Sequence, residues 1–158
     1  MATISSKVSS LGHALPVASA PVANFVASAR TGNLLLVSGQ IAMQDGKATH
    51  PGRLGDRLTI EQGYQSAREA TLGVLSHIAA ATGDQLAKVR RVVRTGVFVA
   101  STDSFTGHSQ VANGASDLLV AVFGDAGRHA RAAVGVASLP LGASVEVEAL
   151  VELEHAHE

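Results

Sequence analysis

The stretch ARAAVGVASLPLGASVEVEAL, residues 130–150, decides the fold of this chain. Two runs rich in Val and Ala, residues 132–138 and 144–153, flank the link Leu139-Pro140-Leu141-Gly142. Pro and Gly between two apolar runs are typical of a turn that joins two strands. The sequence therefore predicts a strand on each side of this link, and it predicts that the two strands pair with each other.

The second of these runs alternates between apolar and acidic residues, and alternate side chains of a strand point to opposite sides of a sheet. The face that we expect to be buried consists of Val145, Val147, Ala149, Val151 and Leu153. The opposite face carries Glu146, Glu148, Leu150, Glu152 and Glu154. Leu150 interrupts the acidic face, so we expect part of it to be covered and Glu148 to be partly desolvated. An ordinary solvated face is the alternative.

The rest of the chain supplies the other elements. Thr59 and Gln62 have the spacing of a capping box, and apolar residues then recur every three or four positions until Gly83, which predicts a long helix. The remaining predictions are a short helix from residue 4 that Pro16 ends, strands at 25–30 and 34–38 around Thr31-Gly32-Asn33, a polar loop at 41–58, a strand at 89–99 and a helix at 108–123.

This order of elements favours an α+β fold in one domain, residues 1–158, with residues 1–16 as an N-terminal extension. Two main helices would pack on one face of a mixed sheet, so the other face needs a cover. Charged residues make up 16% of the chain and hydrophobic residues 46%, whereas about a quarter of a typical soluble domain is charged. Both observations predict a buried subunit interface.

Composition and motifs exclude several classes of function. Twelve basic and 13 acidic residues give no net field for a polyanion, so nucleic acid is not expected as a partner. The chain has no cysteine, its seven histidines form no HExxH motif, and GxxxxGK, GxGxxG and GxSxG are absent, so we expect no metal site. No stretch reaches the length of a membrane span and no signal peptide is evident, which favours a cytoplasmic protein without membrane contact.

Three places could contribute to a binding site. Arg131 comes just where a loop enters a strand, where a guanidinium can bind a carboxylate or phosphate, although a solvated arginine is the alternative. Asn113-Gly114 could form a turn, begin a helix or mark a close approach of two backbones. Ser38-Gly39-Gln40 ends an apolar strand and is either an exit turn or a place where backbone groups meet a ligand.

Several segments in the same order resemble the RidA/YjgF family, which also carries the name endoribonuclease L-PSP. They are RTGNLLLVSGQIA at 30–42, VFVASTDSF at 97–105, HARAAVGVASLP at 129–140 and VEVEALVEL at 145–153. The resemblance covers about residues 20–153, and NGASDLL at 113–119 is similar to one branch of the family. It implies a chorismate-mutase-like fold, a homotrimer with ligand clefts between subunits, and no metal or organic cofactor.

The resemblance also implies an activity: hydrolysis of reactive enamines and imines, such as 2-aminoacrylate and 2-imino acids, to 2-oxo acids and ammonia. By this resemblance Arg131 holds the substrate carboxylate and Glu148 positions or activates the attacking water. Other positions that would contact the substrate are Phe25, Ser38, Gly39, Asn113 and Ala133. The chain departs from the common family pattern at Phe25, Ala133 and Gly135, where tyrosine, cysteine and glutamate are frequent, and these departures leave the substrate open.

Three hypotheses follow. The first is an enamine/imine deaminase that uses Arg131 and Glu148. The second is a trimeric protein that binds a small carboxylate at Arg131 without turnover. The third is an endoribonuclease, which the charge balance disfavours and for which no histidine pair is placed to act as acid and base.

Overall fold

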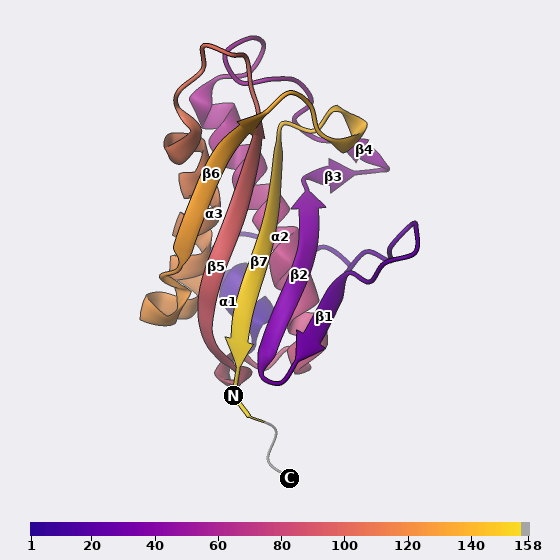
Figure 1. Cartoon of the computed structure of the whole chain (residues 1–158). Helices are drawn as coiled ribbons and strands as arrows, with labels where there is room; N and C mark the ends of the chain where they lie inside the picture. The colour runs from indigo at the N-terminus through magenta and orange to yellow at the C-terminus, as the bar shows by residue number, and fades with distance from the viewer. Residues whose placement is uncertain (156–158) are drawn as a thin grey trace.

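Five strands form one mixed sheet in the order β1-β2-β7-β5-β6 in a computed structural model that describes residues 1–155 (Figure 1). The strands of this sheet are β1 (Ser28–Thr31), β2 (Leu34–Ile41), β5 (Val89–Ala100), β6 (Ala130–Val136) and β7 (Val145–Leu153). The helices are α1 (Ile4–Ser10), α2 (Ile60–Thr82) and α3 (His108–Phe123). Short 3₁₀ segments are η1 (Leu86–Lys88), η2 (Gly124–Gly127) and η3 (Pro140–Gly142), and β3 (Met43–Gln44) pairs with β4 (Lys47–Ala48).

The predicted pairing of the last two strands is wrong. Both strands form, but β5 lies between them: β6 runs parallel to β5, and β7 is antiparallel to both β5 and β2. A parallel strand needs a crossover connection, and α3 provides it between β5 and β6. The link at 139–142 therefore carries the chain past β5 instead of closing a hairpin.

The two long helices agree with the sequence prediction. Thr59 caps α2 in a capping box with Gln62, and Gly83 ends the helix in the left-handed conformation, with φ of 62°. These local signals fix both ends because they satisfy backbone groups that the helix itself leaves unpaired.

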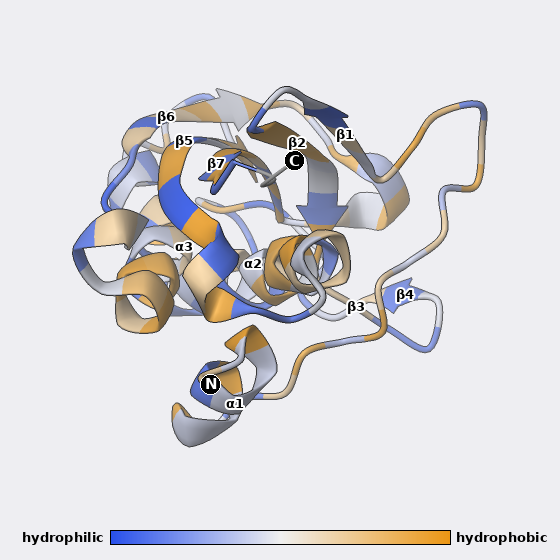
Figure 2. Cartoon of the chain, turned by 90° about the horizontal axis from the view of Figure 1, so that it is seen from below, coloured by the Kyte–Doolittle hydropathy of each residue, from blue (hydrophilic) through white to orange (hydrophobic). Residues whose placement is uncertain are grey.

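The molecule has three layers, which Figure 2 shows edge-on: the sheet, then α2 with α3, then α1. α2 packs against β2 and β7, and α3 packs against β5 and β6, so both cover the same face of the sheet, as predicted. The core between them includes the buried face of β7 that the alternation predicted: Val145, Val147, Ala149, Val151 and Leu153. α1 contributes Ile4 and Val8 to the core from the far side of the helices.

Within residues 1–155, no helix lies over the opposite face of the sheet, called the open face below. Leu36 and Val134 lie on this face, each with 47% of its surface exposed. Two ion pairs lie there as well, Arg90 with Glu152 and Arg94 with Glu148, at 3.8 and 3.7 Å. The structure thus leaves uncovered the face for which the sequence predicts a cover.

Three details of the N-terminal half differ from expectation. α1 ends at Leu11, before Pro16, and the first strand begins at Ser28, so Phe25 precedes it in an irregular segment. The segment expected to be a loop contains the small β3–β4 hairpin, whose turn residues Asp45 and Gly46 both have positive φ, at 52° and 75°. Asp-Gly is a strong signal for such a turn.

Candidate functional site

Arg131 lies at the start of β6 and points to the helix-covered side, where α3 holds its guanidinium. Nη1 donates to Oδ1 of Asn113 at 2.9 Å and to Oγ of Ser116 at 3.1 Å. Nη2 makes a weak contact of 3.5 Å with the carbonyl of Ser109. The structure therefore brings together two predicted site residues, Arg131 and Asn113, and it adds Ser116.

These contacts leave one edge of the guanidinium unused. Nε forms no hydrogen bond with any of the described residues, and Nη2 makes only the weak contact, whereas both hydrogens of Nη1 have partners. Nε–H and one Nη2–H lie along a single edge of the planar group, which is the edge that can donate two parallel hydrogen bonds to a carboxylate. Arg131 is held in place and still has a free edge.

Asn113 and Gly114 lie inside α3, which resolves the alternatives for this pair. A Cβ added to Gly114 would lie 2.0 Å from the carbonyl oxygen of Tyr64 in α2. Gly114 therefore marks a close approach of two helix backbones, and this approach sets the position of α3 from which Asn113 contacts Arg131.

Ala133 and Gly135 follow Arg131 on the same side of β6. Ala133 packs against the core. A Cβ at Gly135 would lie 2.6 Å from Nε2 of His108 and 2.7 Å from Oγ of Ser101. The imidazole of His108 therefore occupies the space beside Gly135, so a longer side chain at this position would require the side chains of His108 and Ser101 to move.

The other predicted site residues gather around a bulge where β2 passes β7. Val37 pairs with Ala149 and Gln40 with Val147, so Ser38 and Gly39 together lie opposite Glu148. Ser38 also fastens the preceding segment, because its hydroxyl donates to the carbonyl of Val26 at 2.8 Å.

Sequence reasoning did not single out Glu146, whose carboxyl lies beside Gly39 of this bulge. A Cβ at Gly39 would lie only 2.1 Å from Oε1 of Glu146, so the absence of a side chain at Gly39 makes room for this carboxyl. Burial, followed by the neighbouring charge of Glu148, raises the pKa of Glu146. Glu148 itself is about half exposed and pairs with Arg94. Glu146 could have been identified only from the strand register, which pairs it with Ile41, two residues after Gly39.

Arg131 and the two glutamates do not meet within one chain. Glu148 is in register with Gly96, and Gly96 is in register with Ala132, so Glu148 faces the open side while Arg131 faces the helices. β7 and β6 are also two strand spacings apart in the sheet, roughly 10 Å. One small molecule cannot contact both groups of the same chain.

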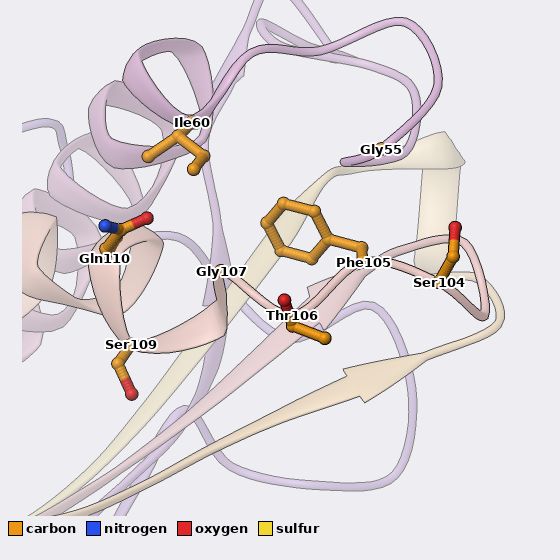
Figure 3. A pocket seen from close by; sticks show the side chains of 8 residues that line it. All are labelled: Gly55, Ile60, Ser104, Phe105, Thr106, Gly107, Ser109 and Gln110. Atoms are coloured by element: carbon orange, nitrogen blue, oxygen red, sulfur yellow. The ribbon is translucent and has the colours of Figure 1, made fainter.

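Among the hollows that the described residues form, two have linings that include none of Arg131, Glu146 and Glu148. The larger, about 900 Å³, runs between the segment 14–27, α2 and the end of β2, and it includes Phe25 and Gly39. The smaller, about 530 Å³, lies beside the start of α3, where the ring of Phe105 stands between Gly55 and Ile60 (Figure 3). Ser109 lines this smaller hollow and connects it to the surroundings of Arg131.

No group of three His, Asp or Glu side chains among residues 1–155 is arranged to hold a metal ion. In the same residues, every helix is too short or too polar to cross a membrane.

Known proteins resemble this chain over nearly its whole length. A family model described as "YjgF/chorismate_mutase-like, putative endoribonuclease" matches residues 5–153. Protein TCP17 of Trypanosoma cruzi is 50% identical over 153 residues, which cover 96% of this chain and 95% of that protein.

Two solved structures share the whole architecture. Atu1372 of Agrobacterium tumefaciens, described as a protein of unknown function, is 43% identical with a TM-score of 0.89, covering 96% of this chain and 92% of that one. A "putative endoribonuclease" from Shewanella oneidensis is 32% identical with a TM-score of 0.90, covering 96% and 99%.

Proposed function

Because the chain belongs to the YjgF/chorismate-mutase-like family, we propose that it is a hydrolytic deaminase of reactive 2-imino acids and enamines, active as a homotrimer. The observation that carries this proposal is the geometry of Arg131: the guanidinium is fixed on α3, and the edge suited to a carboxylate is free. A site that recognises a small carboxylate needs such a preorganised group.

The reaction needs little beyond orientation and a directed water. Arg131 holds the carboxylate of the 2-imino acid, so the adjacent C=N carbon has a fixed position. Water adds to this carbon as the imine nitrogen takes up a proton, and a carboxylate side chain accepts the proton that the water loses. The resulting carbinolamine then breaks its C–N bond, which releases ammonia and leaves the 2-oxo acid.

We propose that the acidic group comes from a neighbouring copy of the chain, since Arg131 and the glutamates of one chain face opposite sides of the sheet. Glu148 is the residue that the family resemblance suggests. Glu146 has two features in its favour: its pKa is raised toward the range useful for proton transfer, and it lies beside Gly39.

The test is an imine-trapping assay. An amino-acid oxidase generates 2-iminopropanoate in situ, semicarbazide traps the imine, and active protein suppresses the trapped product. We expect suppression by the wild type and a loss of about 2–4 kcal/mol in kcat/KM for Arg131→Ala, roughly 30- to 1000-fold. Arg131→Lys is the matched control, because it keeps the charge but loses the planar fork, so we expect an intermediate loss.

Glu146→Gln and Glu148→Gln, compared in the same assay, separate the two acidic candidates. The variant with the larger fall in kcat at unchanged KM identifies the group that handles the water. Full activity in Arg131→Ala would contradict the proposed site.

A second candidate function is binding of a small carboxylate without turnover. One observation favours it and complicates catalysis: within one chain, Arg131 and the two glutamates Glu146 and Glu148 face opposite sides of the sheet. Wild-type protein that binds pyruvate through Arg131 but leaves imine trapping unchanged would support it. Degradation of RNA by the purified protein would instead support the endoribonuclease name that relatives carry.

A further inference from the structure

The hydrogen bonds behind Arg131 have a direction that can be worked out atom by atom. Nδ1 of His129 lies 2.6 Å from the carbonyl oxygen of Gly127, and a carbonyl oxygen can only accept, so Nδ1 carries the hydrogen. Burial lowers the pKa of His129; the hydrogen bond to Gly127 opposes this shift, the charge of Arg131 adds to it, and the net shift is downward, which favours the neutral imidazole near pH 7. A neutral imidazole with its hydrogen on Nδ1 has a bare lone pair on Nε2.

That lone pair decides the orientation of the next group. Nε2 of His129 lies 2.9 Å from Oγ of Ser116, so the Ser116 hydroxyl donates to it. Because the hydroxyl hydrogen of Ser116 is donated to His129, Oγ of Ser116 can only accept from its other neighbour, Nη1 of Arg131, at 3.1 Å. The series runs in one direction, from Arg131 through Ser116 and His129 to the backbone of Gly127.

We propose that Ser116 and His129 are positioning residues that orient the Arg131 guanidinium and keep its free edge available for a carboxylate. This inference rests on the proposed function in so far as that edge binds substrate. η2 anchors one end of the series through Gly127, α3 supplies Ser116 and Asn113, and β6 supplies Arg131, so one series of hydrogen bonds links the guanidinium to α3 and η2.

The charges around His129 agree with this role. The charge that acts on His129 is that of Arg131 on β6, while α3 presents the neutral side chain of Ser116. On η2 and just after it, Asp125 and Arg128 are exposed and pair with each other at 3.3 Å. A ligand carboxylate at Arg131 would partly neutralise the charge that opposes protonation of His129.

The experiment measures Arg131 directly and uses pyruvate as the ligand. NMR of the full-length protein follows rotation of the Arg131 guanidinium about the Nε–Cζ bond, with Arg131→Lys assigning the signal, and calorimetry gives the Kd for pyruvate. We expect slow rotation in the wild type, and in Ser116→Ala faster rotation with pyruvate binding about 3- to 10-fold weaker. Thermal unfolding of each variant shows whether it is folded.

Two substitutions of His129 form a matched pair. In His129→Gln the side-chain oxygen can take the place of Nε2 and accept from Ser116, whereas His129→Asn keeps a donor near Nδ1 and has no acceptor for Ser116. We expect His129→Gln to keep slow rotation and pyruvate affinity, and His129→Asn to behave as Ser116→Ala does. If His129 had only a structural role, the Gln and Asn variants would not differ in guanidinium rotation or pyruvate affinity.

The outcomes are distinguishable from those of the proposed function. Slow rotation retained in Ser116→Ala, or equal behaviour of the two His129 variants, overturns the positioning role whatever the ligand does. If the wild type fails to bind pyruvate through Arg131, the proposed function fails, while the rotation measurement, which needs no ligand, still decides the positioning role.

Discussion

The hydroxyl of Thr95 lies in the core of the sheet without a hydrogen-bond partner among the described residues, and the side chain is 0% exposed. A buried polar group without a partner costs stability. We expect Thr95→Val, which keeps the shape and removes the hydroxyl, to stabilise the protein by about 1 kcal/mol in chemical unfolding. Thr71→Val is the control, because the equally buried hydroxyl of Thr71 donates to the carbonyl of Ala67 at 2.7 Å. The prediction fails if the two variants change stability alike.

The raised pKa of Glu146 predicts that the stability of the protein depends on pH. Because its pKa is raised in the folded chain, its protonated form is favoured there, and its contribution to stability falls as pH rises through that pKa. Glu146→Gln removes this loss, so we expect its Tm to exceed that of the wild type by roughly 1–3 °C at pH 7.5, and the gain to shrink toward pH 4.5. Differential scanning calorimetry at both pH values checks this, and a gain independent of pH would contradict the assignment to ionisation.

The sequence pointed to some site residues and missed others for physical reasons. Arg131 and Asn113 could be predicted because family segments carried them, and they meet in the structure. Ser116 and His129 were missed because a serine on a helix and a histidine in a loop carry no distinctive pattern until the fold brings them together. For Glu146, the alternation of apolar and acidic residues predicted which face of β7 it lies on, but it could not predict which residue of β2 lies beside it.

At the scale of elements, the close approach of α2 and α3 depends on Gly114. Alanine favours helices over glycine by up to about 1 kcal/mol, yet a Cβ here would meet the backbone oxygen of Tyr64 at 2.0 Å. We expect Gly114→Ala to destabilise the protein by about 1–3 kcal/mol in urea unfolding. Gly73→Ala is the matched control inside α2, since the atoms nearest to its Cβ would be side-chain atoms of Gln40, at 3.3 Å or more, and no backbone atom. If Gly114→Ala left the free energy of unfolding unchanged, the two helices would have to be able to move apart.

Helices were predictable to within a few residues because their signals are local: periodicity, the Thr59–Gln62 box and Gly83. The sequence predicted which segments form strands, but it did not predict which strand pairs with which in the sheet. The link at 139–142 has turn residues, and it does contain a tight turn with Leu141 at φ of 58°, but pairing is decided by elements far away in the sequence. β5 enters between β6 and β7 because α3 returns the chain to the outer side of β5.

At the scale of the whole molecule, the open face and the separation of Arg131 from the glutamates both favour assembly. We expect light scattering after size exclusion to give three times the mass of one chain. Val134→Glu would place a charge on the exposed apolar part of β6, so we expect it to shift the protein toward monomer and to abolish imine hydrolysis together.

The matched control is Lys7→Glu on α1, in the layer farthest from the open face (Figure 2), which we expect to leave both the mass and the activity unchanged. A wild-type monomer with full activity would contradict the composite site.

The central place of β7 has a consequence for biosynthesis. β7 is the last strand along the chain, yet it is the one that joins β1–β2 to β5–β6. While the ribosome is still translating residues before 145, the nascent polypeptide holds two strand pairs whose inner edges have nothing to bond to, which is the situation in which chains aggregate. Newly made protein should therefore need chaperone protection until residue 153 has emerged, after which the sheet can close in a single step.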